Sequence, residues 1–120
     1  MKKIITTLLF LITFTNSSFS AGDSSSSDSK SDYTKAHNLI KSAKKYEKKG
    51  KTEKAQKRYA KAQKLLIKSN EKNPLQANTL NYLGFTTRKL GDYKKGEEFY
   101  LLGLQIEPNH KGINEYLGEL

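Results

Sequence analysis

The sequence predicts an all-α protein made of antiparallel helical hairpins. Within residues 80–108, apolar side chains recur at helical spacing on both sides of a Gly-Asp-Tyr break at 91–93. The Leu-Gly pair at 83–84 recurs 34 residues later at 117–118, and the two prolines of the chain are also 34 residues apart. A repeat of this length that holds two helical patterns is typical of hairpins that stack on one another.

The central hairpin shows the pattern most clearly. Its first helix places Leu80, Leu83 and Leu90 near one stripe, with the small Gly84 beside Leu83. Because glycine carries no side chain, we expect the backbones of the two helices to approach closely there. The second helix carries a matching stripe, which consists of Gly96, Phe99, Tyr100, Gly103 and Leu104.

A first hairpin is expected at residues 32–73, with a break between its helices at Gly50. Ser31 or Asp32 is expected to cap its first helix, and Thr52 its second helix. Both helices carry apolar residues at steps of three and four. The two stripes consist of Leu39, Ile40, Ala43 and Tyr46, and of Ala55, Tyr59, Ala62 and Leu66.

The second helix of this hairpin is expected to be long. Its apolar stripe continues through residues 65–67, so the helix should run on towards Asn70. Asn73 is then expected to cap the next helix, with Pro74 in its first turn, where the missing N–H of proline costs nothing.

The order and spacing of these residues resemble the tetratricopeptide repeat, a 34-residue helix–turn–helix unit. Counted back from the second proline, one repeat runs from Ala77 to His110. The sequence departs from the family pattern at Thr87, where a large aromatic residue is usual, and at Gly96 and Gly103, where alanine is commoner. The resemblance implies a short right-handed solenoid. The residues that carry it are Leu80, Leu83, Gly84, Gly91, Tyr100 and Pro108.

The resemblance divides the helical domain at 32–120 into a hairpin at 32–73, a repeat at 74–110 and a final segment at 111–120. The final segment holds only the start of a third repeat. It is either a truncated repeat or the single closing helix that often ends such arrays. In a truncated repeat, the edge that lacks its partner helix is expected to be available for self-association or for another protein. That edge consists of Ile113, Leu117 and Leu120.

Residues 1–20 have the layout of a secretory signal peptide. Lys2 and Lys3 precede an apolar run at 4–14, and small residues follow before Ala21. This run is too short to span a bilayer, which takes about 20 residues. No later stretch is apolar enough to do so. We therefore expect an exported protein, located in a bacterial periplasm, whose mature chain has no transmembrane helix.

Residues 21–31 are rich in serine and aspartate, and residues 22–31 contain no apolar side chain. Such a stretch cannot bury enough apolar surface to offset the entropy of ordering it. We therefore expect a disordered spacer between the signal peptide and the helical domain.

The sequence contains no constellation of residues that predicts catalysis or metal binding. The absence of cysteine excludes disulfides, thiolate metal sites and cysteine nucleophiles. His37 and His110 are far apart in the chain and have no carboxylate at ligand spacing. Glu97 and Glu98 are adjacent on one helix and point about 100° apart, so they cannot face a common substrate. We expect a non-catalytic protein without a metal or cofactor.

Positive charge is concentrated in the first hairpin. Residues 35–72 hold 14 basic and 3 acidic residues, whereas residues 73–120 hold 5 basic and 6 acidic residues. The lysines occupy almost every non-core position, so we expect them to surround the helices rather than form a stripe. With a single arginine among them, nucleic-acid binding is not expected. The hairpin is either a lysine-rich solvated surface or a binder of anionic envelope lipid or polymer.

The resemblance implies a protein–protein interaction module, in which the first helices of the repeats form an inner groove for a partner peptide or helix. Asparagine, arginine and lysine there suit a peptide backbone and an acidic group, and Phe85 suits an apolar anchor. Alternatively, Ile40 and Phe85 pack against each other between the first helices. The implied contact residues are Asn78, Asn81, Phe85, Arg88 and Lys89 in the central repeat, and Lys44 and Lys48 in the first hairpin.

Overall fold

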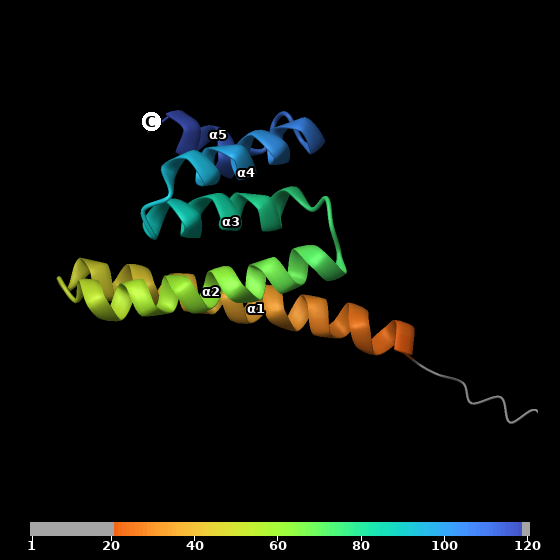
Figure 1. Ribbon diagram of the computed structural model, residues 1–120, viewed down its shortest axis with the longest axis horizontal. Helices are drawn as coiled ribbons and strands as arrows, with labels where there is room; N and C mark the ends of the chain where they lie inside the picture. Colours follow the sequence, from red (N-terminus) through yellow and green to blue (C-terminus); the bar gives the residue numbers. More distant parts are fainter. Residues whose placement is uncertain (1–20, 119–120) are drawn as a thin grey trace, which may run out of the picture.

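The computed structural model describes the backbone of residues 21–118 and the side chains of residues 31–118. This part of the chain forms five α-helices and no strand, which confirms the all-α prediction (Figure 1). The expected signal peptide lies outside the described residues. The helices are α1 (Ala21–Lys48), α2 (Thr52–Lys72), α3 (Ala77–Lys89), α4 (Tyr93–Ile106) and α5 (Lys111–Gly118).

The helices are stacked in the order of the chain (Figure 1). α1 and α2 form one antiparallel pair, α3 and α4 form a second, and α5 packs on α4. α2 also packs against α3, so the two pairs form one continuous body. Further contacts join α1 to α3 and α3 to α5. The first helices of successive hairpins are therefore direct neighbours.

The core runs through all five helices along the apolar stripes. Leu80 and Leu83 are each 1% exposed, and Tyr59 and Tyr100 are fully buried between neighbouring helices. α2 does continue past Asn70 and keeps Leu66 buried, because its stripe is unbroken. The other buried apolar residues are Ala36, Ile40, Ala43, Ala55, Ala62, Ala77, Phe85 and Ile113.

Glycines set the close approach of the second pair of helices. A Cβ placed on Gly84 would come within 2.5 Å of the Tyr100 ring. A Cβ on Gly96 would come within 2.9 Å of the Gly84 carbonyl oxygen, and one on Gly103 within 2.5 Å of Ile113 Cδ1. Real Cβ atoms do not approach other atoms this closely, so a larger residue at any of these positions would force a neighbouring group to shift.

The turn within each hairpin depends on a glycine with positive φ. This glycine is Gly50 (73°) between α1 and α2 and Gly91 (98°) between α3 and α4. After α3, the Gly91 N–H donates to Arg88 O and the Asp92 N–H donates to Thr87 O. This is the hydrogen-bond pattern of a Schellman motif, and the turn after α1 repeats it. Asp92 then caps α4, because its carboxylate accepts a hydrogen bond of 3.1 Å from the Lys95 N–H.

Thr87 explains one departure from the repeat pattern. Its side chain is 2% exposed, and its hydroxyl oxygen accepts a hydrogen bond of 2.9 Å from Gln63 Nε2 on α2. A polar contact between α2 and α3 therefore occupies the position where an aromatic ring would otherwise pack. The pairing satisfies both groups, as a buried position requires.

Two expected helix starts differ from the structure. α1 begins at Ala21 rather than at Ser31 or Asp32, so the backbone of the expected spacer is helical. No proline or glycine interrupts residues 23–48, so nothing in the sequence stops the helix from extending beyond its packed part. Thr52 is the first residue of α2, and Lys51 occupies the cap position without a side-chain hydrogen bond.

The linker between α2 and α3 also differs from expectation. Asn73 is the C-terminal cap residue of α2, and α3 begins only at Ala77. Pro74 therefore belongs to an extended linker and not to the first turn of a helix. Leu75 adopts a φ of 63° and is 62% exposed, so this linker holds a large apolar side chain in the left-handed region.

The final segment forms a packed helix. Ile113 is fully buried against the α4 glycine stripe, so it is not available for self-association. Leu117 is half-buried, and Leu120 lies outside the described residues. Exposed apolar residues are found on the neighbouring helix instead, namely Leu101, Leu102 and Ile106.

Candidate functional site

The residues implied by the repeat resemblance are distributed over the neighbouring helices α1 and α3. Asn81 and Phe85 are each 7% exposed and belong mainly to the packing between helices. Lys44, Lys48 and Asn78 are exposed, and Arg88 and Lys89 are half-buried. The structure thus brings Lys44, Phe85, Arg88 and Lys89 into one region, and places Asn78 at the opposite end of α3.

Aromatic rings line the contact between α1, α3 and α5. The Tyr82 ring lies 5.8 Å from the Tyr33 ring and 5.4 Å from the His37 ring on α1. The Phe85 ring lies 5.1 Å from the Tyr116 ring on α5 and 5.8 Å from the Tyr59 ring on α2. We infer that these rings hold the first helices in register, since offset and edge contacts at this separation are favourable.

Sequence reasoning gave three of these rings, Tyr33, Tyr82 and Tyr116, no role in the contact between the helices. Tyr82 and Tyr116 are 34 residues apart, the same interval as the Leu-Gly pairs, and that interval could have identified them. The alternative prediction, in which Phe85 packs between helices, agrees with its burial. Its ring lies against tyrosines of α2 and α5, and Ile40 belongs to the same buried core.

A pocket of about 280 Å³ opens at the C-terminal end of α3. It combines aromatic walls with charged groups of both signs, and each of the five described helices contributes to its lining. Three of the implied contact residues, Phe85, Arg88 and Lys89, take part in it. The other residues of its lining are Glu47, Gln56, Tyr93 and Tyr116.

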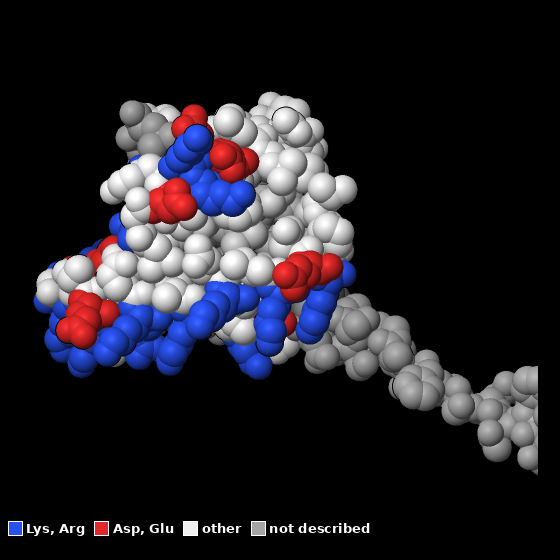
Figure 2. Space-filling model, in the orientation of Figure 1, with Lys and Arg blue, Asp and Glu red and all other residues white. Residues whose placement is uncertain are grey.

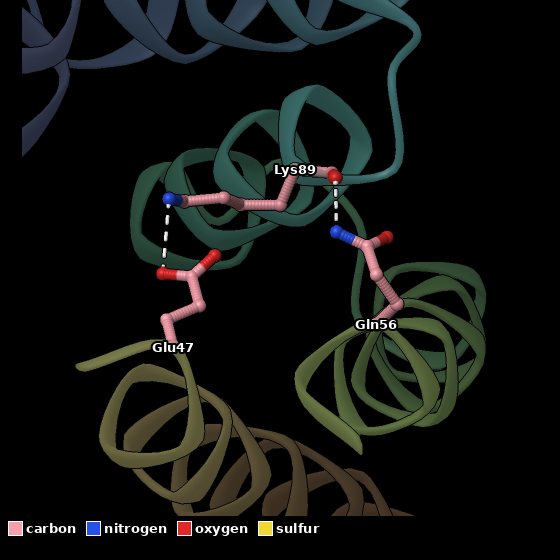
Figure 3. Close-up of polar contacts among 3 residues, drawn as sticks. All are labelled: Glu47, Gln56 and Lys89. Carbon is pink, nitrogen blue, oxygen red and sulfur yellow. Dashed lines mark hydrogen bonds and ion pairs between the residues drawn. The ribbon is translucent and has the colours of Figure 1, made fainter. Parts of the chain in front are cut away.

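Lys89 ties this end of α3 to both helices of the first hairpin (Figure 3). Its Nζ lies 3.2 Å from Glu47 Oε2 on α1, and its carbonyl oxygen accepts a hydrogen bond of 2.9 Å from Gln56 Nε2 on α2. Its ammonium group also lies 5.6 Å from the centroid of the Phe85 ring. Lys89 therefore neutralises Glu47 and helps to position the hairpins, so its charge is already matched.

Two other cations, Arg88 in the lining of the pocket and Lys44 beside it, are not matched by a carboxylate within the described residues. Lys44 Nζ lies 4.7 Å from the centroid of the Phe85 ring, and the Arg88 guanidinium carbon lies 5.8 Å from that of Tyr93. Arg88 Nε is buried and has no hydrogen-bond acceptor among the described residues. An anionic group in the pocket would therefore meet the Arg88 guanidinium, with the Lys44 ammonium close by over the Phe85 ring.

Burial and charge shift the pKa values of nearby groups. Burial, followed by the adjacent Glu47 carboxylate, raises the pKa of Tyr59 far above the ordinary value for tyrosine, so this side chain stays neutral. Burial also lowers the pKa of His37, and the ammonium groups of Lys41 and Lys44 lower it further.

The opposite end of α3 carries a second, uncharged pocket of about 340 Å³. Asn78 belongs to it, and its Oδ1 lies 2.6 Å from His110 Nε2. His110 Nδ1 accepts a hydrogen bond from the Ile113 N–H, so in the neutral ring the proton is on Nε2 and is donated to Asn78. Asn78 therefore anchors the start of α5. The other lining residues are Tyr33, Thr34, Ser69, Asn73, Gln76 and Thr79.

Two kinds of feature are not found among the described residues. Among the side chains of residues 31–118, no three His, Asp or Glu come together where they could hold a metal ion. Within the same part of the chain, no helix combines the length and the apolar character that a membrane crossing requires.

No protein-family model matches the chain, and no curated protein matches it either. The likeness to the tetratricopeptide repeat therefore rests on the residue pattern at 77–110, and the family assignment stays a prediction.

Proposed function

We propose that this protein is a non-catalytic interaction module of the tetratricopeptide type, a short right-handed solenoid of about two and a half hairpins. The order of helix contacts supports this, because α1, α3 and α5 are neighbours while α2 and α4 each pack between two of them. The burial of Leu83 and Tyr100 at signature positions further supports the proposal, as does the close contact of Gly84 with the Tyr100 ring.

The partner in this proposal is a peptide segment or helix that presents an acidic group next to an apolar side chain. The pocket at the C-terminal end of α3 carries the proposal. Its lining offers Arg88 as an unmatched cation and the Tyr93 and Tyr116 rings as apolar walls, and the Lys44 ammonium lies over the Phe85 ring beside it. A carboxylate paired with arginine in a partly dry pocket forms a stronger hydrogen bond than a neutral pair does.

The proposed setting is the cell envelope, reached through the signal peptide expected at residues 1–20. The protein would act there by shape, as a rigid surface that holds one partner in place. A preformed surface loses little conformational freedom on binding, which favours affinity.

The test is site-specific photocrosslinking in intact cells. A photoreactive amino acid at Tyr93, which is 63% exposed at the rim of the pocket, should crosslink one discrete partner. The same group at Leu102, which is 40% exposed on α4, is the matched control and should not.

A second variant links the crosslink to the pocket chemistry. Arg88→Gln should abolish the Tyr93 crosslink, and Lys94→Gln, which removes the same charge from an exposed position of α4, should leave it intact. Equal crosslinking at both positions, or a Tyr93 crosslink that survives Arg88→Gln, would contradict the proposed groove.

A further inference from the structure

The exposed lysines of α2 form a narrow stripe. Lys54, Lys57, Lys61, Lys64 and Lys68 follow one another at steps of three and four residues, and all five are exposed. At 3.6 residues per turn they fall within an arc of about 80° around the helix axis. This corrects the expectation that the lysines surround the helix. The remaining faces of α2 pack against α1 and α3, so the charge is confined to one side.

α1 extends the same basic surface. Lys41, Lys45 and Lys48 are exposed at steps of four and three residues. Figure 2 shows lysine and arginine side chains gathered along the edge of the α1–α2 pair that faces away from α3, while the part formed by α4 and α5 mixes both signs. We call the α2 stripe and these three α1 residues the basic face.

Few lysines of the basic face are paired with a carboxylate. Lys57 pairs with Glu53 at 3.7 Å, with both side chains largely exposed. Among the ion pairs of the described residues, none involves Lys61, Lys64 or Lys68. Free ammonium groups this close to one another raise the local potential and attract a surface of opposite charge.

An exposed apolar side chain lies beside the stripe. Ile67 is 42% exposed and lies about 60° around the helix axis from Lys64, the edge of the stripe. An open depression of about 380 Å³ is lined by Ile67 together with Lys64, Leu65, Lys68 and Glu71. An isoleucine next to ammonium groups matches the boundary between lipid headgroups and acyl chains. A soluble anionic polymer would gain nothing from the exposed isoleucine.

The basic face lacks the features that nucleic-acid strands use. Its charges are lysines, which act as point charges rather than as planar forks. Arg58, the arginine of this hairpin, lies with its guanidinium carbon 4.9 Å from the Tyr46 ring centroid, and Tyr59 is fully buried. No aromatic ring of the stripe is therefore free to stack on bases.

From this arrangement we propose that the basic face binds the surface of an anionic phospholipid bilayer, with Ile67 at the level of the headgroups. The proposal goes beyond the partner groove and does not depend on it, because the pocket at the C-terminal end of α3 is formed by other residues. Attachment through the basic face would leave that pocket open to a partner.

The test is partition of the full chain between buffer and vesicles of phosphatidylglycerol and phosphatidylcholine in equal amounts. Vesicles of pure phosphatidylcholine give the part of binding that does not depend on lipid charge. The variant Lys61→Gln, Lys64→Gln, Lys68→Gln should lower the charge-dependent partition constant at least tenfold, since each lysine near such a surface contributes about 1 kcal/mol. All three side chains are exposed, so circular dichroism should be unchanged.

The matched control removes the same charge elsewhere. Lys94→Gln, Lys95→Gln, Lys111→Gln, all exposed on α4 and α5, should lower the partition constant less than about threefold. Replacing the three stripe lysines with arginine should retain binding, and Ile67→Ser should weaken it. An equal loss in both glutamine triples would overturn the proposal, because net charge alone would then be responsible.

Competition decides between a bilayer and a polymer. Polyphosphate at equal phosphate concentration should displace the chain from vesicles only weakly if the bilayer is the preferred partner. Tight binding to polyphosphate together with no charge-dependent vesicle binding would overturn the bilayer proposal and indicate a soluble polyanion.

Discussion

The contact between Gly84 and Tyr100 shows how single residues set the geometry of this protein. The Tyr100 ring fills the space that a side chain at position 84 would occupy, and it is fully buried there. In an isolated helix, alanine would be favoured over glycine by about 1 kcal/mol. The close contact outweighs this preference, because the space belongs to a rigid ring in a packed core and not to the end of a flexible chain.

Gly84→Ala should destabilise the protein by roughly 1–3 kcal/mol, the usual cost of overpacking, despite the better helix propensity of alanine. Urea unfolding followed by circular dichroism measures the change. Gly118→Ala is the control, since nothing lies within 4 Å of a Cβ at that position, and it should be neutral or slightly stabilising. If Gly84→Ala also stabilised the protein, α3 and α4 would have to be further apart than described.

His37 should make stability depend on pH. Its pKa in the folded protein is lowered from 6.5, first by burial and then by Lys41 and Lys44, while the Tyr82 ring covers it from α3. The unfolded chain therefore binds its proton at a higher pH. Stability should be intact above pH 6.5 and should fall as the pH drops through 6.5 towards the lower folded-state pKa.

The comparison of the wild-type chain with His37→Gln isolates this effect. The difference in the free energy of unfolding between the two proteins, measured from pH 8 to pH 5, should change in that window, with the wild type losing more stability on the acid side. A difference that does not vary with pH would show that His37 has the same pKa in the folded and unfolded states.

At the scale of the elements, the two hairpins are joined by few polar links and a large apolar contact. The Lys89–Glu47 pair is prominent in Figure 3, but the two side chains are 36% and 31% exposed. Ion pairs with this exposure contribute about 0–1 kcal/mol, whereas each large buried side chain contributes about 1.5–3 kcal/mol. Tyr59 and Phe85, in edge contact between α2 and α3, therefore contribute more to docking than the ion pair does.

A double-mutant cycle on Lys89→Met and Glu47→Gln should give a coupling energy below about 1 kcal/mol, and this coupling should shrink at high salt. Urea unfolding of the four proteins measures it. The pair Lys95 and Glu98, within α4 and more exposed, provides a comparison that should couple still less. A coupling above about 2 kcal/mol would mean that charge and not apolar packing holds the hairpins together.

At the scale of the whole molecule, each helix contacts mainly its neighbours along the stack. α1 and α2 make extensive contact with each other, α3 joins them to α4, and α5 contacts only α3 and α4 among the described helices. In such a stack, the free energy of unfolding is close to the sum of the intrinsic stabilities of the units and the interaction free energies between adjacent units. The ends should therefore open more easily than the middle.

Ile113→Ala should test this directly. Ile113 is fully buried at the α4–α5 contact, so its truncation should destabilise by about 2–5 kcal/mol locally. Native-state hydrogen exchange should speed up in α4 and α5 and stay unchanged in α1 and α2. An equal acceleration in all five helices would show that residues 31–118 unfold as one cooperative unit.

Much of the local structure follows from the sequence by itself. The steps of three and four residues predicted the helices and the buried residues Leu83, Tyr59 and Leu66, because a regular helix turns such spacing into a single face. Gly50 and Gly91 predicted the turns, because a left-handed conformation there favours glycine. These requirements are local, so they can be read without knowledge of the neighbours.

Tertiary structure decided the rest. The start of α3 at Ala77 instead of Pro74 and the aromatic contacts of Tyr82 both depend on which surfaces of each helix are covered. The pocket that joins Arg88 to α1 and α4 likewise exists only because distant segments meet. Residue spacing determines which face a side chain occupies, and only packing determines whether that face meets another helix or water.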